Sequence, residues 1–467
     1  MSGEHLLPGT TLRQRTADAV ADERLRTNVA RAVDRFAAHR RTGLAELDDA
    51  DALRAAARAA KAQVLADLPA QLERFADQVL ARGGQVCWAP TADDARRYIV
   101  DVVRGHGATR VAKSKSMATE EIALNPALEA AGAEVVETDL GEWIIQLAGE
   151  TPSHIIAPAL HRDRHQIKDL FVSEVAAPPS LATEPTDLVR FARGRLREVF
   201  LAAEVGITGA NIGVADTGSI VLVTNEGNGR LVTALPRVHV AVLGMERLAA
   251  DWAQADLLLA LLARSATGQR LSSYTSVVTG VRGPGEADGP DELHVVILDN
   301  GRSELLAGEF HEMLGCIRCG ACLNVCPVYR QTGGHAYGWV YPGPMGAVLT
   351  PLLAADQPEA AEVAGASTLC GACMDACPVQ IPLQDLLLSL RRRKAEAAGR
   401  PERAAWQAWA TAWGDPRAYR ATTRAAGWTR WATSLAGRLP LGRAWAAGRT
   451  VPVPAPERFR DRWQAGL

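Results

Sequence analysis

Apolar residues recur at intervals of three and four along the first 80 residues of the chain. Val29, Val33 and Phe36 fit one helical stripe in this way, and similar stripes follow after them. Such spacing is typical of amphipathic helices that bury one face. We therefore predict helices over residues 10–80 and assign residues 1–84 to an N-terminal helical region.

Short β-prone runs alternate with helical patterns between residues 85 and 300. This alternation predicts an α/β domain whose parallel or mixed sheet is covered by helices on both faces. Strands are expected at residues 86–89, 109–113, 134–139, 155–158, 220–224, 238–243 and 293–298, and helices at 91–106, 119–131, 165–175, 186–205 and 251–264. The runs 220–224 and 238–243 are strongly apolar, so we expect them to be inner strands.

The pattern changes again beyond residue 300. Residues 301–390 form a cysteine-rich module, with helical patterns at 309–314 and 383–391 on either side of the cysteines. Residues 391–467 form a basic, tryptophan-rich and helical C-terminal region. No run of about 18 apolar residues interrupts the chain, so no transmembrane helix is expected. The polar first 14 residues lack the apolar core of a secretory signal, which predicts a cytoplasmic protein.

Charge is spread unevenly between body and tail. The chain carries a formal net charge of −2, but residues 391–467 hold 16 basic and 5 acidic side chains, a net +11 that leaves −13 on the rest. The tail tryptophans are Trp406, Trp409, Trp413, Trp428, Trp431, Trp445 and Trp463. Tryptophan with arginine suits partner docking, contact with anionic lipid headgroups, or packing onto the chain's own acidic body. An acidic body without a basic recognition helix argues against nucleic acid binding.

Seven of the eight cysteines lie between residues 316 and 377. In a reducing cytoplasm this density indicates metal binding rather than disulfides. The eighth, Cys87, stands alone in an apolar stretch and is expected to pack in a core.

The first cysteine motif has the spacing of bacterial ferredoxins. It reads Cys316-x2-Cys319-x2-Cys322-x3-Cys326-Pro327. Its short turns aim successive sulfurs at successive irons of one cluster, and Gly320 lets the backbone approach closely. A structural zinc site is the alternative, but zinc needs only paired C-x2-C knuckles and would leave three thiols spare. The linker of about 40 residues between the motifs and the flanking helical patterns favour a helical ferredoxin arrangement.

The second motif lacks one cysteine. It reads Cys370-x2-Cys373-x3-Cys377-Pro378, and alignment on the Cys-Pro ends puts Ser367 where the first cysteine would stand. The fourth cysteine of such a motif ligates the other cluster. The predicted ligands are therefore Cys316, Cys319, Cys322 and Cys377 for cluster 1, and Cys326, Cys370 and Cys373 for cluster 2. We expect two 4Fe-4S clusters, the second of which converts to a 3Fe-4S form or keeps one iron open as a Lewis acid.

Two loops of the α/β domain suggest an anion site. Lys113 and Lys115 stand between a strand and a helix, with Ser114 and Ser116 beside them, where a helix N-terminus favours negative charge. Arg230 follows a Gly/Asn-rich stretch at another strand end. We predict that Lys113, Lys115 and Arg230 contribute to a site for a small carboxylate or other anion. The alternatives are a solvated loop and ordinary turns.

These segments together resemble a known family. The order "VAKSKSM", "GITGANIGVADTGSIVLVTNEGNGR", "CIRCGACLNVCPVYR" and "STLCGACMDACPVQIPL" is similar to the bacterial lactate-utilisation protein B family over nearly the whole chain. The resemblance implies a lactate-utilisation (LUD) domain related to ribose-phosphate isomerase and CoA-transferase-like folds, a two-cluster ferredoxin module, and a family-specific C-terminal region. The family's seven cluster cysteines match those named above one by one, whereas no catalytic residue carries over.

The leading hypothesis is therefore an electron-relay subunit. The resemblance implies L-lactate oxidation to pyruvate beside two partner subunits, a cysteine-rich protein and a LUD-domain protein. No nucleotide motif such as G-x-G-x-x-G follows the first strand, so hydride acceptance is assigned to another subunit. The rival hypotheses are an iron–sulfur subunit of a different 2-hydroxy-acid or quinone oxidoreductase and a cluster-based redox sensor. Membrane association through the basic tail remains an alternative to a purely cytoplasmic protein.

Overall fold

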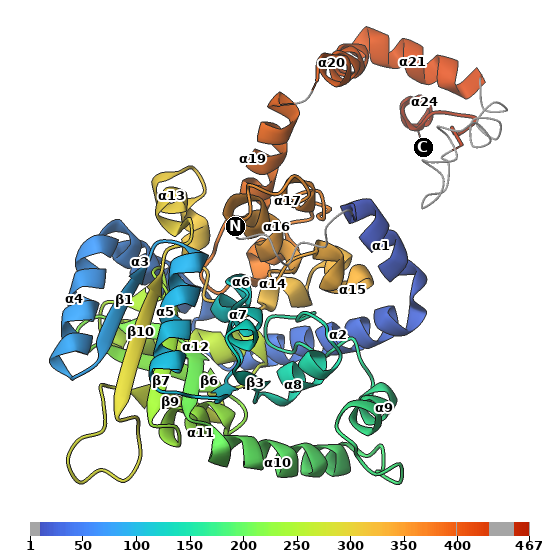
Figure 1. Cartoon of the computed structure of the whole chain (residues 1–467). Coiled ribbons are helices and arrows are strands. Elements are labelled where there is room, and N and C mark those ends of the chain that lie inside the picture. The colour runs from blue at the N-terminus through green and yellow to red at the C-terminus, as the bar shows by residue number, and fades with distance from the viewer. Residues whose placement is uncertain (1–9, 398, 429–452, 467) are drawn as a thin grey trace. The chain divides into compact units, whose positions relative to one another are not determined.

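The computed structural model describes residues 10–397, 399–428 and 453–466. The chain divides into two compact units, Met1–Arg391 and Arg392–Leu467. Figure 1 shows the elements of each unit in chain order.

Four helices open the first unit, as the apolar spacing predicts. They are α1 (Leu12–Ala21), α2 (Glu23–Ala45), α3 (Ala50–Ala66) and α4 (Leu68–Ala81). The side chains of Thr11, Asp22 and Asp49 cap the first three by accepting backbone N–H groups. Helix α2 buries Val29 and Val33 and packs against α12 (Trp252–Ala266) of the α/β part. It also packs against α14 (Ala321–Asn324) and α15 (Pro327–Thr332) of the cysteine module.

A six-stranded, wholly parallel sheet forms the centre of the α/β part (Figure 1). Its order is β1 (Gln85–Ala89), β10 (Glu292–Leu298), β7 (Val238–Gly244), β4 (Val205–Gly209), β2 (Arg110–Lys113) and β3 (Glu134–Glu137). Successive residues of a strand point to opposite faces. On β2, Val111 joins the core under α5 (Ala92–Gly105) and α7 (Leu124–Ala130), whereas Ala112 joins the core under α8, α9, α10 and α11. Their bounds are α8 (Leu140–Leu147), α9 (Arg164–Glu174), α10 (Pro185–Ala202) and α11 (Asn228–Ala234).

A second, smaller sheet contains both parallel and antiparallel strand pairs, and of its strands only the one at residues 219–224 was predicted from the sequence. Its order is β8 (Leu248–Ala249), β5 (Ile212–Val214), β6 (Ser219–Thr224) and β9 (Tyr274–Val278). The two runs expected to be inner strands are β6, which lies between β5 and β9, and β7, which lies between β10 and β4. Both expectations are confirmed.

Three expected elements differ in the structure. Residues 155–158 are not a strand but a buried loop, closed by a hydrogen bond of 3.0 Å from Ser153 N to Pro158 O. The single helix expected at 119–131 is two helices, α6 (Met117–Glu121) and α7, because Ala123 adopts a left-handed φ of 48° between them. The helix expected at 186–205 is α10, which ends earlier, at Ala202, and residue 205 is instead the first residue of strand β4.

Two glycines of strand β4, Gly206 and Gly209, permit close packing against neighbouring elements. A Cβ atom on Gly206 would lie 2.1 Å from the carbonyl oxygen of Val232 in α11, and one on Gly209 would lie 2.5 Å from Ser116 Oγ. Only glycine allows strand β4 to approach its neighbours this closely.

The cysteine module consists of short helices and shares a core with the α/β part. Its elements are α13 (Arg302–Ala307), η1 (His311–Gly315), α14 (Ala321–Asn324), α15 (Pro327–Thr332), η2 (His335–Tyr337), α16 (Gly343–Leu353), α17 (Ala360–Val363), α18 (Ala372–Ala376) and α19 (Leu383–Glu396). The residues expected to be helical at 309–314 mainly form a 3-10 turn. One hydrophobic core includes Val33 of α2, Leu258 of α12 and Cys319 of the module, so it continues across residue 300.

The second unit contains α20 (Arg400–Gly414), α21 (Pro416–Trp428) and α24 (Phe459–Gln464). Trp406, Trp409 and Trp413 lie on one side of α20, and each is at least half exposed. Their rings follow each other at centroid distances of 5.9 and 5.7 Å. Trp431 and Trp445 lie outside the described residues. Within the described ranges, no helix is both long and apolar enough to cross a membrane.

Candidate metal centres and a neighbouring cavity

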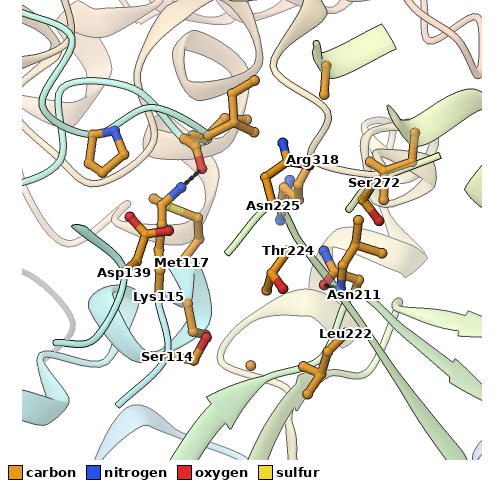
Figure 2. A pocket seen from close by; sticks show the side chains of 18 of the residues that line it. Ser114, Lys115, Met117, Asp139, Asn211, Leu222, Thr224, Asn225, Ser272 and Arg318 are labelled. Carbon is orange, nitrogen blue, oxygen red and sulfur yellow. Dashed lines mark hydrogen bonds between the residues drawn. The ribbon is translucent and has the colours of Figure 1, made fainter. Parts of the chain in front are cut away.

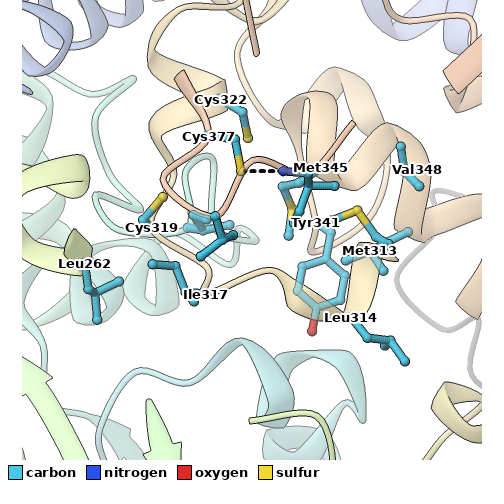
Figure 3. Packing of buried hydrophobic residues seen from close by; sticks show 14 of the residues in the cluster. Leu262, Met313, Leu314, Ile317, Cys319, Cys322, Tyr341, Met345, Val348 and Cys377 are labelled. Carbon is cyan, nitrogen blue, oxygen red and sulfur yellow. Dashed lines mark hydrogen bonds between the residues drawn. The ribbon is translucent and has the colours of Figure 1, made fainter. Parts of the chain in front are cut away.

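Four cysteines line one small enclosed cavity in the module: Cys316, Cys319, Cys322 and Cys377. Figure 3 shows three of them among the buried apolar side chains Met313, Ile317 and Met345. The motif reaches this arrangement through a left-handed pair, Arg318 at φ 58° and Gly320 at φ 76°, which curls the chain around the cavity. We call this set of four cysteines the first centre.

The other three cysteines, Cys326, Cys370 and Cys373, line a second cavity together with Ser367. Here too a left-handed pair shapes the turn, with Leu369 at φ 57° and Gly371 at φ 84°. Cys370 is exposed, whereas the other two are buried. We call this set the second centre. The two cavities thus divide the seven cysteines into sets of four and three.

Two buried thiols of the first centre, Cys319 and Cys377, are better suited to binding a metal than to standing free. Burial raises the pKa of the Cys319 thiol to about 12 and that of Cys377 to about 11, so neither ionises readily without a nearby positive charge. A bound metal ion supplies that charge and holds the thiolate. Backbone amides are already directed at the sulfurs, from Arg318 to Cys316 at 3.4 Å and from Ile381 to Cys377 at 3.3 Å.

Positive side chains from distant elements surround the first centre. Arg54 of α3 donates to the Cys377 carbonyl at 2.9 Å, and Arg40 of α2 donates to the Ala376 carbonyl at 2.8 Å. Arg247 donates to the Cys316 carbonyl at 2.9 Å, and Lys61 is buried nearby, bonded to the Leu248 carbonyl at 3.1 Å. Sequence reasoning missed all four. Arg40, Arg54 and Lys61 lie on amphipathic helices, where basic residues are normally solvated, and Arg247 lies in the turn before β8.

A cavity of about 480 Å³ lies beyond the carboxyl ends of β2, β4 and β7, which is the usual binding edge of an α/β sheet. Figure 2 shows Lys115 and Asp139 on one side of it and Arg318, Asn211 and Thr224 on the other. Its charged lining residues are Lys115, Arg247, Arg302 and Arg318 against Asp139, Glu226 and Glu246. The lining therefore has an excess of one positive charge.

The structure separates the three predicted anion-binding residues. Lys115 lines the cavity, where its amino group donates to the Ile155 carbonyl. Lys113 is fully buried and paired with Glu120, at 2.9 Å, and with Glu137. Arg230 is two-thirds exposed, lies 3.8 Å from Asp288, and does not belong to the described lining. Of the three, only Lys115 stands where it can meet a ligand in this cavity.

The cavity and the first centre share a wall. Arg318 lines the cavity with its side chain, while its backbone N–H donates to Cys316 Sγ. Among the described residues, its Nη1 atom has no hydrogen-bond partner. Ile155 lines both the cavity and the first centre. A ligand in the cavity would therefore lie close to the first centre, with Arg318 between them.

Buried ion pairs fix that wall. Arg302 bonds Glu121 at 2.7 Å and Glu246 at 2.8 Å, and Arg318 lies 3.3 Å from Glu246. Tyr341 donates to Glu121 at 2.6 Å and stacks under the Arg318 guanidinium. Burial alone would raise the pKa of Glu246, but Arg302 and Arg318 outweigh it and hold the pKa at about 2. The network thus joins the α/β part to the cysteine module through charges that stay ionised.

The matching family models define the class of protein. A 4Fe-4S dicluster domain matches residues 312–381, and a LUD domain matches residues 72–298. With the two cysteine centres beside an α/β sheet, these matches make the chain an iron–sulfur protein with a LUD domain. A third model, lactate utilisation protein B C-terminal, matches residues 389–466.

Curated relatives narrow the class further. A Lactate utilization protein B from Shouchella clausii is 46% identical over 459 residues, covering 97% of this chain and 96% of the relative. Another from Bacillus licheniformis is 46% identical over 457 residues, covering 96% and 95%. The chain therefore belongs to the lactate utilisation protein B family. A crystal structure of a DUF162 family protein from Deinococcus radiodurans also matches, at 14% identity and a TM-score of 0.28, over 50% of this chain and 98% of that one.

Proposed function

We propose that this protein is the iron–sulfur electron-transfer subunit of a complex that oxidises L-lactate to pyruvate, and that two 4Fe-4S clusters relay single electrons through it. The observation that carries the proposal is the division of the seven cysteines into two adjoining centres. In this proposal Cys316, Cys319, Cys322 and Cys377 hold one cluster, and Cys326, Cys370 and Cys373 hold the other. Such clusters supply reversible one-electron exchange.

Lactate oxidation removes two electrons and two protons at once, so a second subunit has to perform that step. We assign it to a partner of the lactate-utilisation complex, either a cysteine-rich protein or a LUD-domain protein. This chain contributes the connection between two sites. The first centre lies behind the cavity wall, and the second reaches the surface at Cys370. A docked partner can therefore exchange electrons at Cys370 without entering the α/β part.

The cavity gives the α/β part its own role in the proposal. The lining has one positive charge in excess, and Lys115 and Arg318 present cationic groups to it. A small carboxylate would balance this charge and gain charge-assisted hydrogen bonds. We place the carboxylate or another small anion here, with Lys115 as a binding residue. An anion bound beside Arg318 would also alter the electrostatic surroundings of the first centre.

Anaerobic purification followed by reconstitution tests the proposal. The isolated chain should contain about eight iron atoms, as two four-iron clusters require. The chain combined with its lactate-utilisation partners should reduce an artificial acceptor in the presence of lactate, and omission of this chain should stop the reduction. Four or fewer iron atoms per chain, or full turnover without this chain, would contradict the proposal.

The exposed tryptophans of α20 suit a docking role. Trp406, Trp409 and Trp413 form an aromatic row on α20, and each side chain is at least half exposed. Tryptophan is enriched at protein interfaces, where it buries a large area and keeps a polar N–H. We propose that this row binds a partner subunit. Vesicles with anionic lipid provide the competing surface in a binding assay, and binding to vesicles alone would favour a membrane contact instead.

A further inference from the structure

The two cysteine turns have the same backbone shape, but one begins with cysteine and the other with serine. In both, a left-handed residue and a left-handed glycine precede a short helix: Arg318 and Gly320 before α14, and Leu369 and Gly371 before α18. A non-glycine residue in this conformation costs about 1 kcal/mol or more and persists only where its surroundings require it. The repeated strain indicates that both turns are built around the same kind of bound group.

A hydrogen bond shows that the serine side chain takes the place of the cysteine side chain. In the first turn, the backbone N–H of Arg318 donates to Cys316 Sγ at 3.4 Å. In the second, the backbone N–H of Leu369 donates to Ser367 Oγ at 3.1 Å. The donor stands two residues after the acceptor in each case. Ser367 Oγ therefore occupies the position in its turn that a ligand sulfur occupies in the other.

The rest of the second cavity offers few other side chains that could bind iron in place of Ser367. Apart from the three cysteines, its described polar side chains are Ser367, Thr368 and Gln384. The Thr368 hydroxyl is engaged with the Cys370 thiol. Gln384 approaches from α19, and its Oε1 lies 3.0 Å from the position a Cβ on Gly371 would take. Neither stands at the ligand position of the turn. Arg391 fixes the start of the turn by donating to the Ser367 carbonyl at 2.6 Å.

We propose that Ser367 Oγ is the fourth protein ligand of the second cluster, bound as an alkoxide. This inference rests on the proposed function, because it requires a cluster in the second centre. On binding, the Oγ–H bond breaks, an iron–oxygen bond forms and the proton passes to water, as metal binding generally releases the protons of its ligands. Ser367 is half-buried, so solvent is near enough to take the proton. The ligand charge equals that of a cysteine thiolate.

Oxygen in place of sulfur makes one corner of the cluster different. A hard alkoxide matches iron less well than a soft thiolate when the other ligands are sulfur. The iron held by Ser367 should therefore be the first to leave on oxidation, although it stays bound under anaerobic conditions. This reconciles a stable four-iron cluster with only three cysteines.

Two substitutions at Ser367 and one control substitution at Gln384 test the assignment on anaerobically purified full-length protein. Ser367→Ala should carry a three-iron second cluster from the outset, detected by its electron-paramagnetic signal and by a loss of about one iron per chain. Ser367→Cys should keep the four-iron form in air for longer than the wild type. Gln384→Leu should match the wild type in both respects.

Mössbauer spectra of the wild type enriched in ⁵⁷Fe give a measurement that does not depend on any variant folding. One iron of the second cluster should differ from the rest, and Ser367→Cys should remove the difference. The assignment is overturned if Ser367→Ala keeps the wild-type iron content and signal, or if Gln384→Leu produces the three-iron form instead. A wild type that holds no iron in the second centre would refute the proposed relay itself, which is a distinguishable outcome.

Discussion

The first and second centres place similar turns in opposite surroundings. The first is enclosed by helices α2 and α3, has four cysteines, and has Arg40, Arg54 and Arg247 bonded to the carbonyls around it. The second has three cysteines and a serine, and Cys370 is exposed with Asp375 as its charged neighbour. The cluster-binding motif alone therefore does not determine how a cluster behaves. Burial and charge from other parts of the chain decide its robustness and its reduction potential.

The largest expected effect comes from breaking the first centre. Cys319→Ala should abolish lactate-dependent growth, because loss of a ligand interrupts the connection between cavity and surface. The six-stranded sheet should stay folded, since its two remaining cores contain no residue of the cysteine module. Growth, iron content and circular dichroism measure the three parts of this prediction. Wild-type growth of the mutant on lactate would rule out the relay role.

A charge reversal in the cavity should have the next largest effect. Lys115→Glu should lower lactate turnover by the complete complex by more than about tenfold, a loss of about 1.4 kcal/mol of transition-state stabilisation. Iron content should not change. Arg230→Glu is the matched control, because Arg230 lies outside the described cavity lining, and it should stay within about twofold of the wild type. Equal turnover in the two variants would make the cavity irrelevant to catalysis.

The two centres should lose iron at different rates when the protein is exposed to air. The second centre should lose iron first and give a three-iron signal, whereas the first should stay intact behind its apolar wall. Iron analysis and electron-paramagnetic spectra over time follow both processes. Simultaneous loss from both centres would show that burial does not protect the first.

The smallest predicted effect is electrostatic. Arg54→Met removes a positive charge that favours the more negative, reduced state, so the reduction potential of the first centre should fall by roughly 50 mV, the scale expected for one charge at an effective protein dielectric. Arg58→Met on the same helix is the control, because Arg58 pairs with Glu312 at 2.9 Å and is half exposed. Potentiometric titration compares the variants, and equal shifts would assign the effect to general surface charge.

Local patterns predicted the parts of this protein that local interactions determine. The helices before residue 84 and the parallel sheet follow from spacing along the chain. The assignment of the cysteines to two clusters stays a prediction. The loop at residues 155–158 looked like a strand because it is apolar, but Ile155 is buried against the cavity and the first centre rather than in a sheet. A buried loop and a buried strand are both apolar, so a short apolar run does not distinguish between them.

The surroundings of the first centre could not be predicted in this way. Arg54 and the Cys377 carbonyl are 323 residues apart in the chain and 2.9 Å apart in space. Similarly, Lys113 ends a strand, where a ligand-binding residue could stand, but it pairs with the buried Glu137 and the partly buried Glu120. Whether a charge binds a ligand, pairs internally or steadies a cluster depends on tertiary partners. The predicted kinship with ribose-phosphate isomerase and CoA-transferase-like folds stays a prediction.

Arg40 of α2 and Arg54 of α3 bind the carbonyl groups of residues 375–377, so contacts between the start and the end of the first unit form late during synthesis. Ribosomes add about 5–20 residues per second, so Arg54 leaves the ribosome roughly 20–60 seconds before the Cys377 carbonyl that it binds. During that interval the faces of α2 and α3 that meet the cysteine module have no permanent partner, whereas α12 is already available to pack against both helices. Any group bound by all four cysteines of the first centre would have to enter after Cys377 has emerged, and it would enter most freely before Arg40 and Arg54 bond residues 376 and 377.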